Sequence, residues 1–256
     1  MTGVQTCALP ISDIVREVID KNGRGSIMRL NHLQPPFNNP KVRAAVRLGV
    51  NQEDYMRASQ GDDTTAWQVC RNLWWRGTPY YTGELEDLMP QSLDKAKAAL
   101  KESGYNGEKV VIINPTDFPD IGPLGDVTYE LLKSMGMNVE MAASDWGTVI
   151  QRRNSREPVE KGGWSIFHTT GAAVGWGNPA LSNLVRGPGD KGWFGWWTNA
   201  KAEEMAEEWL YAPDEAKQKQ VAVALGRLAL EECATIPLGQ FVIKTAYRKE
   251  IGRAHV

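Results

Sequence analysis

Cysteine and histidine are scarce in this sequence, and their positions exclude several kinds of site. The 256 residues contain only three of each: Cys7, Cys70, Cys233, His32, His168 and His255. None of the cysteines lies in a C-x-x-C pair or at a Cys/His ligand spacing, so the sequence predicts no metal site. A bridge between Cys70 and Cys233 is the one disulfide that the pattern leaves open. No G-x-G-x-x-G, P-loop, G-x-S-x-G or H-E-x-x-H signature occurs.

An excess of charge of one sign is also missing. The chain has 29 Lys and Arg against 31 Asp and Glu, a formal net charge of -2. A nucleic-acid-binding protein needs a clustered basic face, so we expect no nucleic-acid partner. No apolar run approaches the roughly 18–20 residues of a membrane helix. The acidic pairs Glu203-Glu204 and Glu207-Glu208 have the spacing of a solvated helix face, so we expect no enzyme and no cofactor.

The two ends of the sequence differ from the rest. Residues 1–11 lack the basic start and the apolar stretch of a signal peptide. They and residues 250–256 resemble translated sequencing-adapter sequence, and we interpret both as a non-native leader and tail that pack poorly. Residues 12–30 are expected to be the remnant of a preceding segment, with a short helix or strand and a turn at Asn22-Gly23.

The middle of the chain alternates between strand and helix patterns. Short apolar runs predict strands over 109–113, 138–142 and 164–168. Apolar residues at helical spacing predict helices between them, over 124–135 and 146–153. This alternation is typical of an α/β sheet with parallel members. Further segments are predicted as helices after Pro40 and Ser92 and over 52–59, 200–211 and 213–233, and as an extended segment over 236–242.

Tryptophan is abundant where other signals are scarce. Five of the ten tryptophans fall between Trp164 and Trp197. Trp176 and Trp193 lie in glycine-rich stretches, which suggests shaped loops rather than strand interiors. These rings would either line a ligand pocket or anchor the loops on the core. Taken one by one they favour the core, whereas the cluster as a whole favours a ligand wall.

A family resemblance rests on the order of several motifs. They are the segments Pro35–Val46, Leu48–Glu53, Ser92–Tyr105, Leu131–Glu140 with Asp145-Trp146 after it, and Ala234–Leu238. In this order they resemble the signature elements of solute-binding protein family 5. That family comprises peptide-, nickel- and some oligosaccharide-binding components of ABC importers. The resemblance covers roughly residues 31 to 249.

The resemblance implies a type II periplasmic-binding-protein-like lobe, an α/β fold with a mixed sheet flanked by helices. Residues 31–249 would be the C-terminal lobe of a two-lobed protein, with the chain returning toward the first lobe after about residue 238. Apolar surface would then be exposed at Ile236, Leu238 and Phe241. Such a protein is periplasmic or extracytoplasmic, delivers its ligand to ABC permease subunits in the membrane, and is monomeric at full length.

The expected ligand surface lies in the loops 71–78, 170–178 and 193–197, because open α/β sheets bind ligands beyond their strand ends. We expect Arg71 to pair with a ligand carboxylate. The other candidates are Trp74, Trp176 and Trp193 as walls, with Thr170, Gly171 and Asn178 as polar contacts.

The family pattern leaves the ligand class open. Dipeptide binders carry an Asp-Pro after the strand at 164–168 and an acidic residue before it that grips the peptide amine. Here the corresponding residues are Asn178-Pro179 and about Gly175. A peptide or similar small solute is the leading interpretation, with an oligosaccharide or another non-peptide ligand as the alternative. From other classes, a hydrolase or a ligand-sensing regulator stays open.

Overall fold

The computed structural model describes residues 14–248, and its centre is a six-stranded mixed sheet. The strand order is β3-β7-β2-β6-β4-β5. β4 runs parallel to both β5 and β6, whereas the pairs β2–β6, β2–β7 and β3–β7 are antiparallel. The bounds are β2 Arg24–Leu30, β3 Trp67–Gln68, β4 Val110–Pro115, β5 Val139–Ser144, β6 Ile166–Ala172 and β7 Ile236–Phe241.

The α/β fold with a mixed sheet is confirmed. β4, β5 and β6 correspond to the three predicted strands and are neighbours in one sheet. The helices form where Asn, Ser and Asp side chains accept hydrogen bonds from first-turn N–H groups, as Asn39, Ser92 and Asp145 do. The predictions for residues 1–11 and 250–256 fall outside the described residues.

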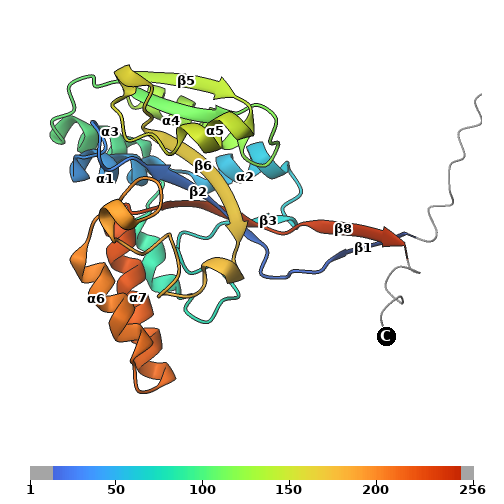
Figure 1. Ribbon diagram of the computed structural model, residues 1–256. Coiled ribbons are helices and arrows are strands. Elements are labelled where there is room, and N and C mark those ends of the chain that lie inside the picture. The colour runs from blue at the N-terminus through green and yellow to red at the C-terminus, as the bar shows by residue number, and fades with distance from the viewer. Residues whose placement is uncertain (1–13, 249–256) are drawn as a thin grey trace, which may run out of the picture.

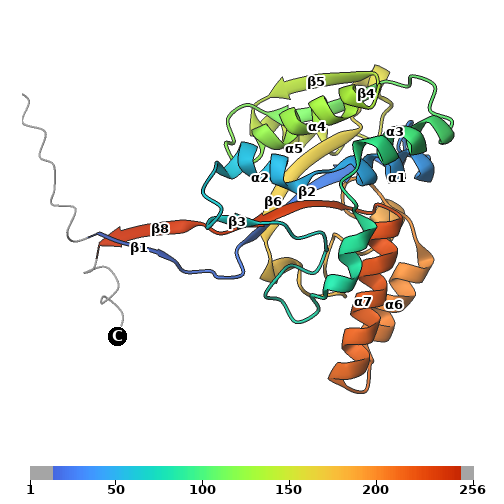
Figure 2. The same ribbon diagram turned by 180° about the vertical axis from the view of Figure 1, so that it is seen from behind.

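Helices cover both faces of the sheet (Figures 1 and 2). One face is covered by α1–α4 and the other by α5, while α6 and α7 form an antiparallel pair that projects from the sheet. The bounds are α1 Pro40–Gly49, α2 Gln52–Gln60, α3 Leu93–Glu102, α4 Gly122–Ser134, α5 Trp146–Arg152, α6 Ala200–Leu210 and α7 Glu215–Glu231.

Part of the segment before residue 31 belongs to this sheet. We predicted a short helix or a strand for residues 12–30, and the described part of this segment forms two strands, β1 (Ile14–Val18) and β2. β2 lies between β6 and β7, with six of its seven residues buried. Arg24–Leu30 is therefore a central element of the folded unit. That the lobe of the full-length protein begins near residue 31 stays a prediction.

A two-stranded ribbon leaves the body of the protein. β1 pairs in antiparallel fashion with β8 (Lys244–Arg248), and the pair projects to one side (Figures 1 and 2). The expectation of exposed apolar residues in β7 is wrong, because Ile236, Leu238 and Phe241 are at most 1% exposed. β7 lies between β3 and β2 in the sheet and α2 packs against it, and all six of its residues are buried.

Large exposed apolar side chains lie instead on and beside the ribbon. Ile14, Ile19 and Ile243 are 43%, 65% and 51% exposed. Cys70 and Cys233 are separate buried thiols, so the open disulfide does not form in this structure. Within residues 14–248 no helix is long and apolar enough to cross a membrane. The same residues hold no group of three or more His, Cys, Asp or Glu side chains that would bind a metal.

Candidate functional site

The carboxyl ends of three strands share one edge of the sheet. β4 ends at Pro115, β5 at Ser144 and β6 at Ala172, and the parallel pairings bring these ends to the same side. The ribbon leaves from this side too, because Arg24 at the start of β2 pairs with Ala172. In open α/β sheets this edge is where ligands bind.

Two tryptophans lie against a pair of glycines near this edge. Gly25 of β2 is the direct partner of Gly171 in β6. A Cβ atom on Gly25 would lie 2.1 Å from Cζ2 of Trp75, and one on Gly171 would lie 2.4 Å from Cζ2 of Trp176. The two indole rings are 6.0 Å apart at an interplanar angle of 31°. The strands thus make room for aromatic rings at the position where a ligand would approach.

The two rings differ in exposure. Trp75 is fully buried, and its indole N–H has no hydrogen-bond partner among the described residues. Trp176 is half-buried, between the exposed residues Val174 and Gly175 and the half-buried Gly177. Of the two, Trp176 is therefore the ring that a solute can reach, with Trp75 behind it.

A cation and a hydroxyl lie beside the glycine pair. The guanidinium of Arg24 donates from Nη2 to Thr170 Oγ1 at 3.1 Å. Both residues are half-buried, and Arg24 makes no ion pair with a described carboxylate. The edge therefore presents an uncompensated positive charge next to the predicted residues Thr170 and Gly171.

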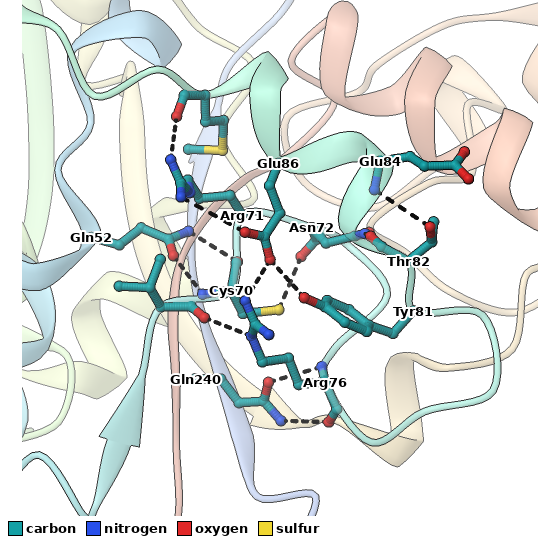
Figure 3. A network of polar contacts seen from close by, with 12 residues as sticks. Gln52, Cys70, Arg71, Asn72, Arg76, Tyr81, Thr82, Glu84, Glu86 and Gln240 are labelled. Carbon is teal, nitrogen blue, oxygen red and sulfur yellow. Dashed lines mark hydrogen bonds and ion pairs between the residues drawn. The ribbon is translucent and has the colours of Figure 1, made fainter.

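The loop that carries Trp75 is fastened by the network in Figure 3. The side chain of Gln240 in β7 accepts a hydrogen bond from Arg76 N at 3.0 Å and donates one to Arg76 O at 3.0 Å. It also donates to Asn22 O at 2.6 Å. One amide of the sheet therefore fixes the backbone next to Trp75 and the turn before β2 together.

The carboxylate of Glu86 contacts two arginines and a tyrosine of the neighbouring segment (Figure 3). Its carboxylate accepts from Arg76 Nη2 at 2.6 Å and from the Tyr81 hydroxyl at 2.7 Å, and it lies 3.7 Å from Arg71 Nη2. Burial and the hydrogen bond to Glu86 raise the pKa of Tyr81 to about 12. Arg71 thus has a carboxylate partner in the short 3-10 helix Gly83–Leu88, and its role toward a ligand stays a prediction.

Trp74 does not form an exposed wall, so this expectation is wrong. Its side chain is fully buried, and its indole N–H donates to Ala222 O of α7 at 2.8 Å. Its ring packs edge-on against Tyr80 at 5.9 Å. Neighbouring residues in this irregular loop point in different directions, which places Trp74 in the core and Trp75 against Gly25.

The remaining candidates do not all converge. Trp193 is half-buried and lies 5.5 Å from the Phe167 ring, four residues before Gly171 in β6. That spacing corresponds to roughly 13 Å along the strand. Asn178 accepts a hydrogen bond from Ala180 N at 2.9 Å and shapes a local turn. The structure brings Thr170, Gly171 and Trp176 together and leaves Trp193 farther along the sheet.

Three residues at the site were not among the predicted ones: Arg24, Gly25 and Trp75. Gly25 carries a signal that sequence reasoning can use, because a glycine inside a strand often marks the close approach of another group. That signal required β2 to be recognised as a strand. Trp75 lies inside the predicted loop 71–78 without having been singled out.

Comparison with known proteins begins with solved structures. A substrate-binding protein of an ABC transporter, CtaP from Listeria monocytogenes, superposes with a TM-score of 0.79 at 16% identity, covering 92% of this chain and 46% of that one. The periplasmic binding protein DppA from Helicobacter pylori, in complex with peptide STSA, gives a TM-score of 0.73 at 20% identity, covering 94% and 45%. The fold is therefore that of a periplasmic-binding-protein lobe.

Sequence relatives identify the family. The model of the bacterial extracellular solute-binding proteins, family 5, matches residues 9–193. A probable peptide ABC transporter periplasmic-binding protein, y4tO of Sinorhizobium fredii, is 32% identical over 92% of this chain and 44% of its own length. The glutathione-binding protein GsiB of Escherichia coli (strain K12) is 24% identical over 98% and 51%. The chain belongs to family 5, as the motif order predicted, and spans about half the length of these relatives.

Proposed function

We propose that the chain is one lobe of a two-lobed extracytoplasmic solute-binding protein of an ABC importer, and that it binds a peptide or similar small solute. The observation that carries this proposal is the shared edge: strand ends, Trp176 and the ribbon β1–β8 all lie on one side. Two strands that leave together suit a hinge to a second lobe, and hinge closure encloses ligand between lobes.

The same proposal assigns the protein's surroundings. A peptide or another small solute is the ligand, ABC permease subunits in the membrane receive it, and the site needs no cofactor. The Sinorhizobium relative is by its name a periplasmic-binding protein of a peptide ABC transporter, which supports a periplasmic or extracytoplasmic location. The exposed apolar residues Ile14, Ile19 and Ile243 would lie at the junction of the lobes. We expect a monomer at full length.

The binding test uses a protein that carries both lobes. Calorimetric titration with the tetrapeptide Ser-Thr-Ser-Ala should give saturable binding, and Trp176→Ala should weaken it by about tenfold or more, the loss of one buried aromatic contact. Tyr211→Ala is the matched control, because Tyr211 is an exposed aromatic residue at the C-terminal end of α6, away from β6. An unchanged affinity in Trp176→Ala would contradict the assigned surface.

An oligosaccharide or another non-peptide solute is the second candidate. The loop from Thr170 to Asn178 has no acidic residue to meet a peptide amine, and it presents the half-buried ring of Trp176. A ring without a facing carboxylate suits a neutral ligand held by stacking and hydrogen bonds. Titration with a neutral oligosaccharide beside the tetrapeptide distinguishes the two candidates, since only one of them should saturate the site.

A further inference from the structure

A second concave surface lies on the opposite face of the sheet from Gly25 and Gly171. It is a groove of about 680 Å³ between α2, α3 and α4. Its apolar floor is formed by Gly49, Leu93, Val127 and Leu131, and Leu93 is 37% exposed. An exposed leucine in a concave apolar surface is a feature of interaction sites.

Three carboxylates surround this floor. Asp54 of α2 and Asp126 and Glu130 of α4 line the groove and are exposed. None of them forms an ion pair with a described cation, and Lys133 on the next turn of α4 places its Nζ over the Tyr129 ring instead, 6.0 Å from its centroid. Like charges one helical turn apart, as in α4, destabilise a helix slightly.

A donor at one end of the groove is also free. Gln91 has a backbone φ of 55°, in the left-handed region, and its side-chain Nε2 is buried without a partner among the described residues. Buried donors are normally satisfied, and a non-glycine residue in this conformation carries a conformational cost. A peptide carbonyl at this end of the groove would give the amide the acceptor that it lacks.

The floor is built on the strand that carries the candidate site. Tyr55 lines the groove, and its hydroxyl lies 3.0 Å from Thr128 Oγ1 of α4. The same Thr128 oxygen lies 2.8 Å from Nε2 of His168 in β6. The wall of the groove is thus held to β6 by a buried hydrogen-bond chain.

We propose that this groove docks a basic, amphipathic segment of a partner protein. An apolar side chain of the segment packs on Leu93, Val127 and Leu131, and its lysine or arginine side chains meet Asp54, Asp126 and Glu130. A membrane surface fits less well, because an acidic rim is repelled by anionic lipid headgroups. This surface is separate from the solute site, so the proposal does not rest on the proposed function.

The test is a fluorescence-anisotropy titration of the chain with a short labelled peptide built from lysine and leucine, and with its glutamate–leucine counterpart. We expect the first peptide to bind and the second not to bind. The triple variant Asp54→Asn, Asp126→Asn, Glu130→Gln should weaken binding by about tenfold, because each exposed ion pair contributes a small amount and three are lost. Leu93→Ser should also weaken it.

The matched control changes net charge equally at exposed carboxylates outside the groove, with Asp87→Asn, Glu102→Gln and Glu215→Gln. We expect this variant to bind like the original chain, and circular dichroism should show that both triple variants are folded. An equal loss of peptide affinity in the control variant would show that net charge alone causes the effect, and it would overturn the proposal. Absent binding of the lysine–leucine peptide, unchanged binding in Leu93→Ser, or groove-dependent binding to phosphatidylglycerol vesicles would each overturn it too.

Discussion

Gly25 of β2 and Gly171 of β6 face each other across two neighbouring strands, and each leaves its backbone open to an indole ring. The rings of Trp75 and Trp176 occupy the space that two side chains would otherwise fill. The glycines thus set the position of both aromatic groups at the candidate site. Because Trp75 is buried and Trp176 is half-buried, substitution of the two glycines should have different consequences.

Gly25→Ala should destabilise the fold. The added methyl group would lie 2.1 Å from the Trp75 ring, which is enclosed and has to move. Overpacking of this kind costs about 1–3 kcal/mol, which a urea unfolding curve measures. Gly83→Ala is the control, because a Cβ atom there meets nothing within 4 Å and φ is not positive. Equal shifts in the two variants would show that Trp75 is not held against Gly25.

Gly171→Ala should act on the solute site more than on stability. Its methyl group would lie 2.4 Å from the Trp176 ring, which has solvent on one side and can turn outward. We expect a stability loss below that of Gly25→Ala, together with a weaker affinity for the tetrapeptide in a protein with both lobes. An intact affinity would indicate that the position of Trp176 does not matter to binding.

Tyr81 should make the fold sensitive to alkali. Its pKa is raised to about 12 in the folded chain, whereas the ordinary pKa of tyrosine is 10.0. Because the pKa is raised on folding, Tyr81 contributes to the stability of the fold, and this contribution is fully present below pH 10 and is lost as the pH rises toward 12. Urea unfolding at a series of alkaline pH values should show a smaller decline in Tyr81→Phe than in the original chain. If stability declined equally with pH in both proteins, a protonated Tyr81 that donates to Glu86 would be contradicted.

Part of the fold was predictable because its signals are local. β4, β5 and β6 are short apolar runs next to turns, and α3 begins at Ser92, a preferred cap residue. β2 was not predictable in this way. Its sequence, Arg24 to Leu30, contains two arginines and a glycine, and it becomes a central strand only through pairing with β6 and β7, far away in the chain.

The candidate site was predictable only in part for a related reason. The loop 71–78 has no periodicity, so nothing local distinguishes Trp74, which points into the core, from Trp75, which lies on Gly25. The apolar pattern of β7 likewise does not show that α2, far away in the chain, will pack against it. The loop 170–178 follows a strand that the sequence does reveal, and the structure brings Thr170, Gly171 and Trp176 of this loop together, while their role toward a ligand stays a prediction.

Arg29→Lys should be costly although it conserves charge. The guanidinium of Arg29 is buried and donates to Phe194 O at 2.8 Å, Ala234 O at 2.7 Å and Thr235 Oγ1 at 2.6 Å. An ammonium group cannot reproduce this fork, and buried acceptors left without donors cost about 1–3 kcal/mol each. We expect a loss of about 2–4 kcal/mol in urea unfolding.

The control for this substitution is Arg57→Lys, at an exposed arginine on α2. Surface substitutions of this kind usually stay within about 0.5 kcal/mol. If both variants unfold at the same urea concentration, the hydrogen bonds of Arg29 do not contribute to stability as the geometry indicates.

His168 should make the fold sensitive to acid. The Nε2 atom of His168 lies 2.8 Å from Thr128 Oγ1, and the hydroxyl of Thr128 also lies 3.0 Å from Leu124 O. The other ring nitrogen, Nδ1, has no hydrogen-bond partner among the described residues. Burial lowers the pKa of His168 to about 3, because the charged ring would lose its hydration in the core.

The consequence is a defined pH window. A folded-state pKa below the ordinary histidine value of 6.5 means that the unfolded chain binds the proton first, so stability is lost as the pH falls from about 6.5 toward 3. His168→Gln keeps an N–H group for Thr128 but does not titrate. Urea unfolding between about pH 6 and pH 4 should therefore show a shallower decline, by up to about 1.4 kcal/mol per pH unit. Tyr55→Phe removes another hydrogen-bond partner of Thr128 and leaves His168 in place, so it should retain the steeper decline. Equal slopes in the two variants would show that His168 is not the titrating group.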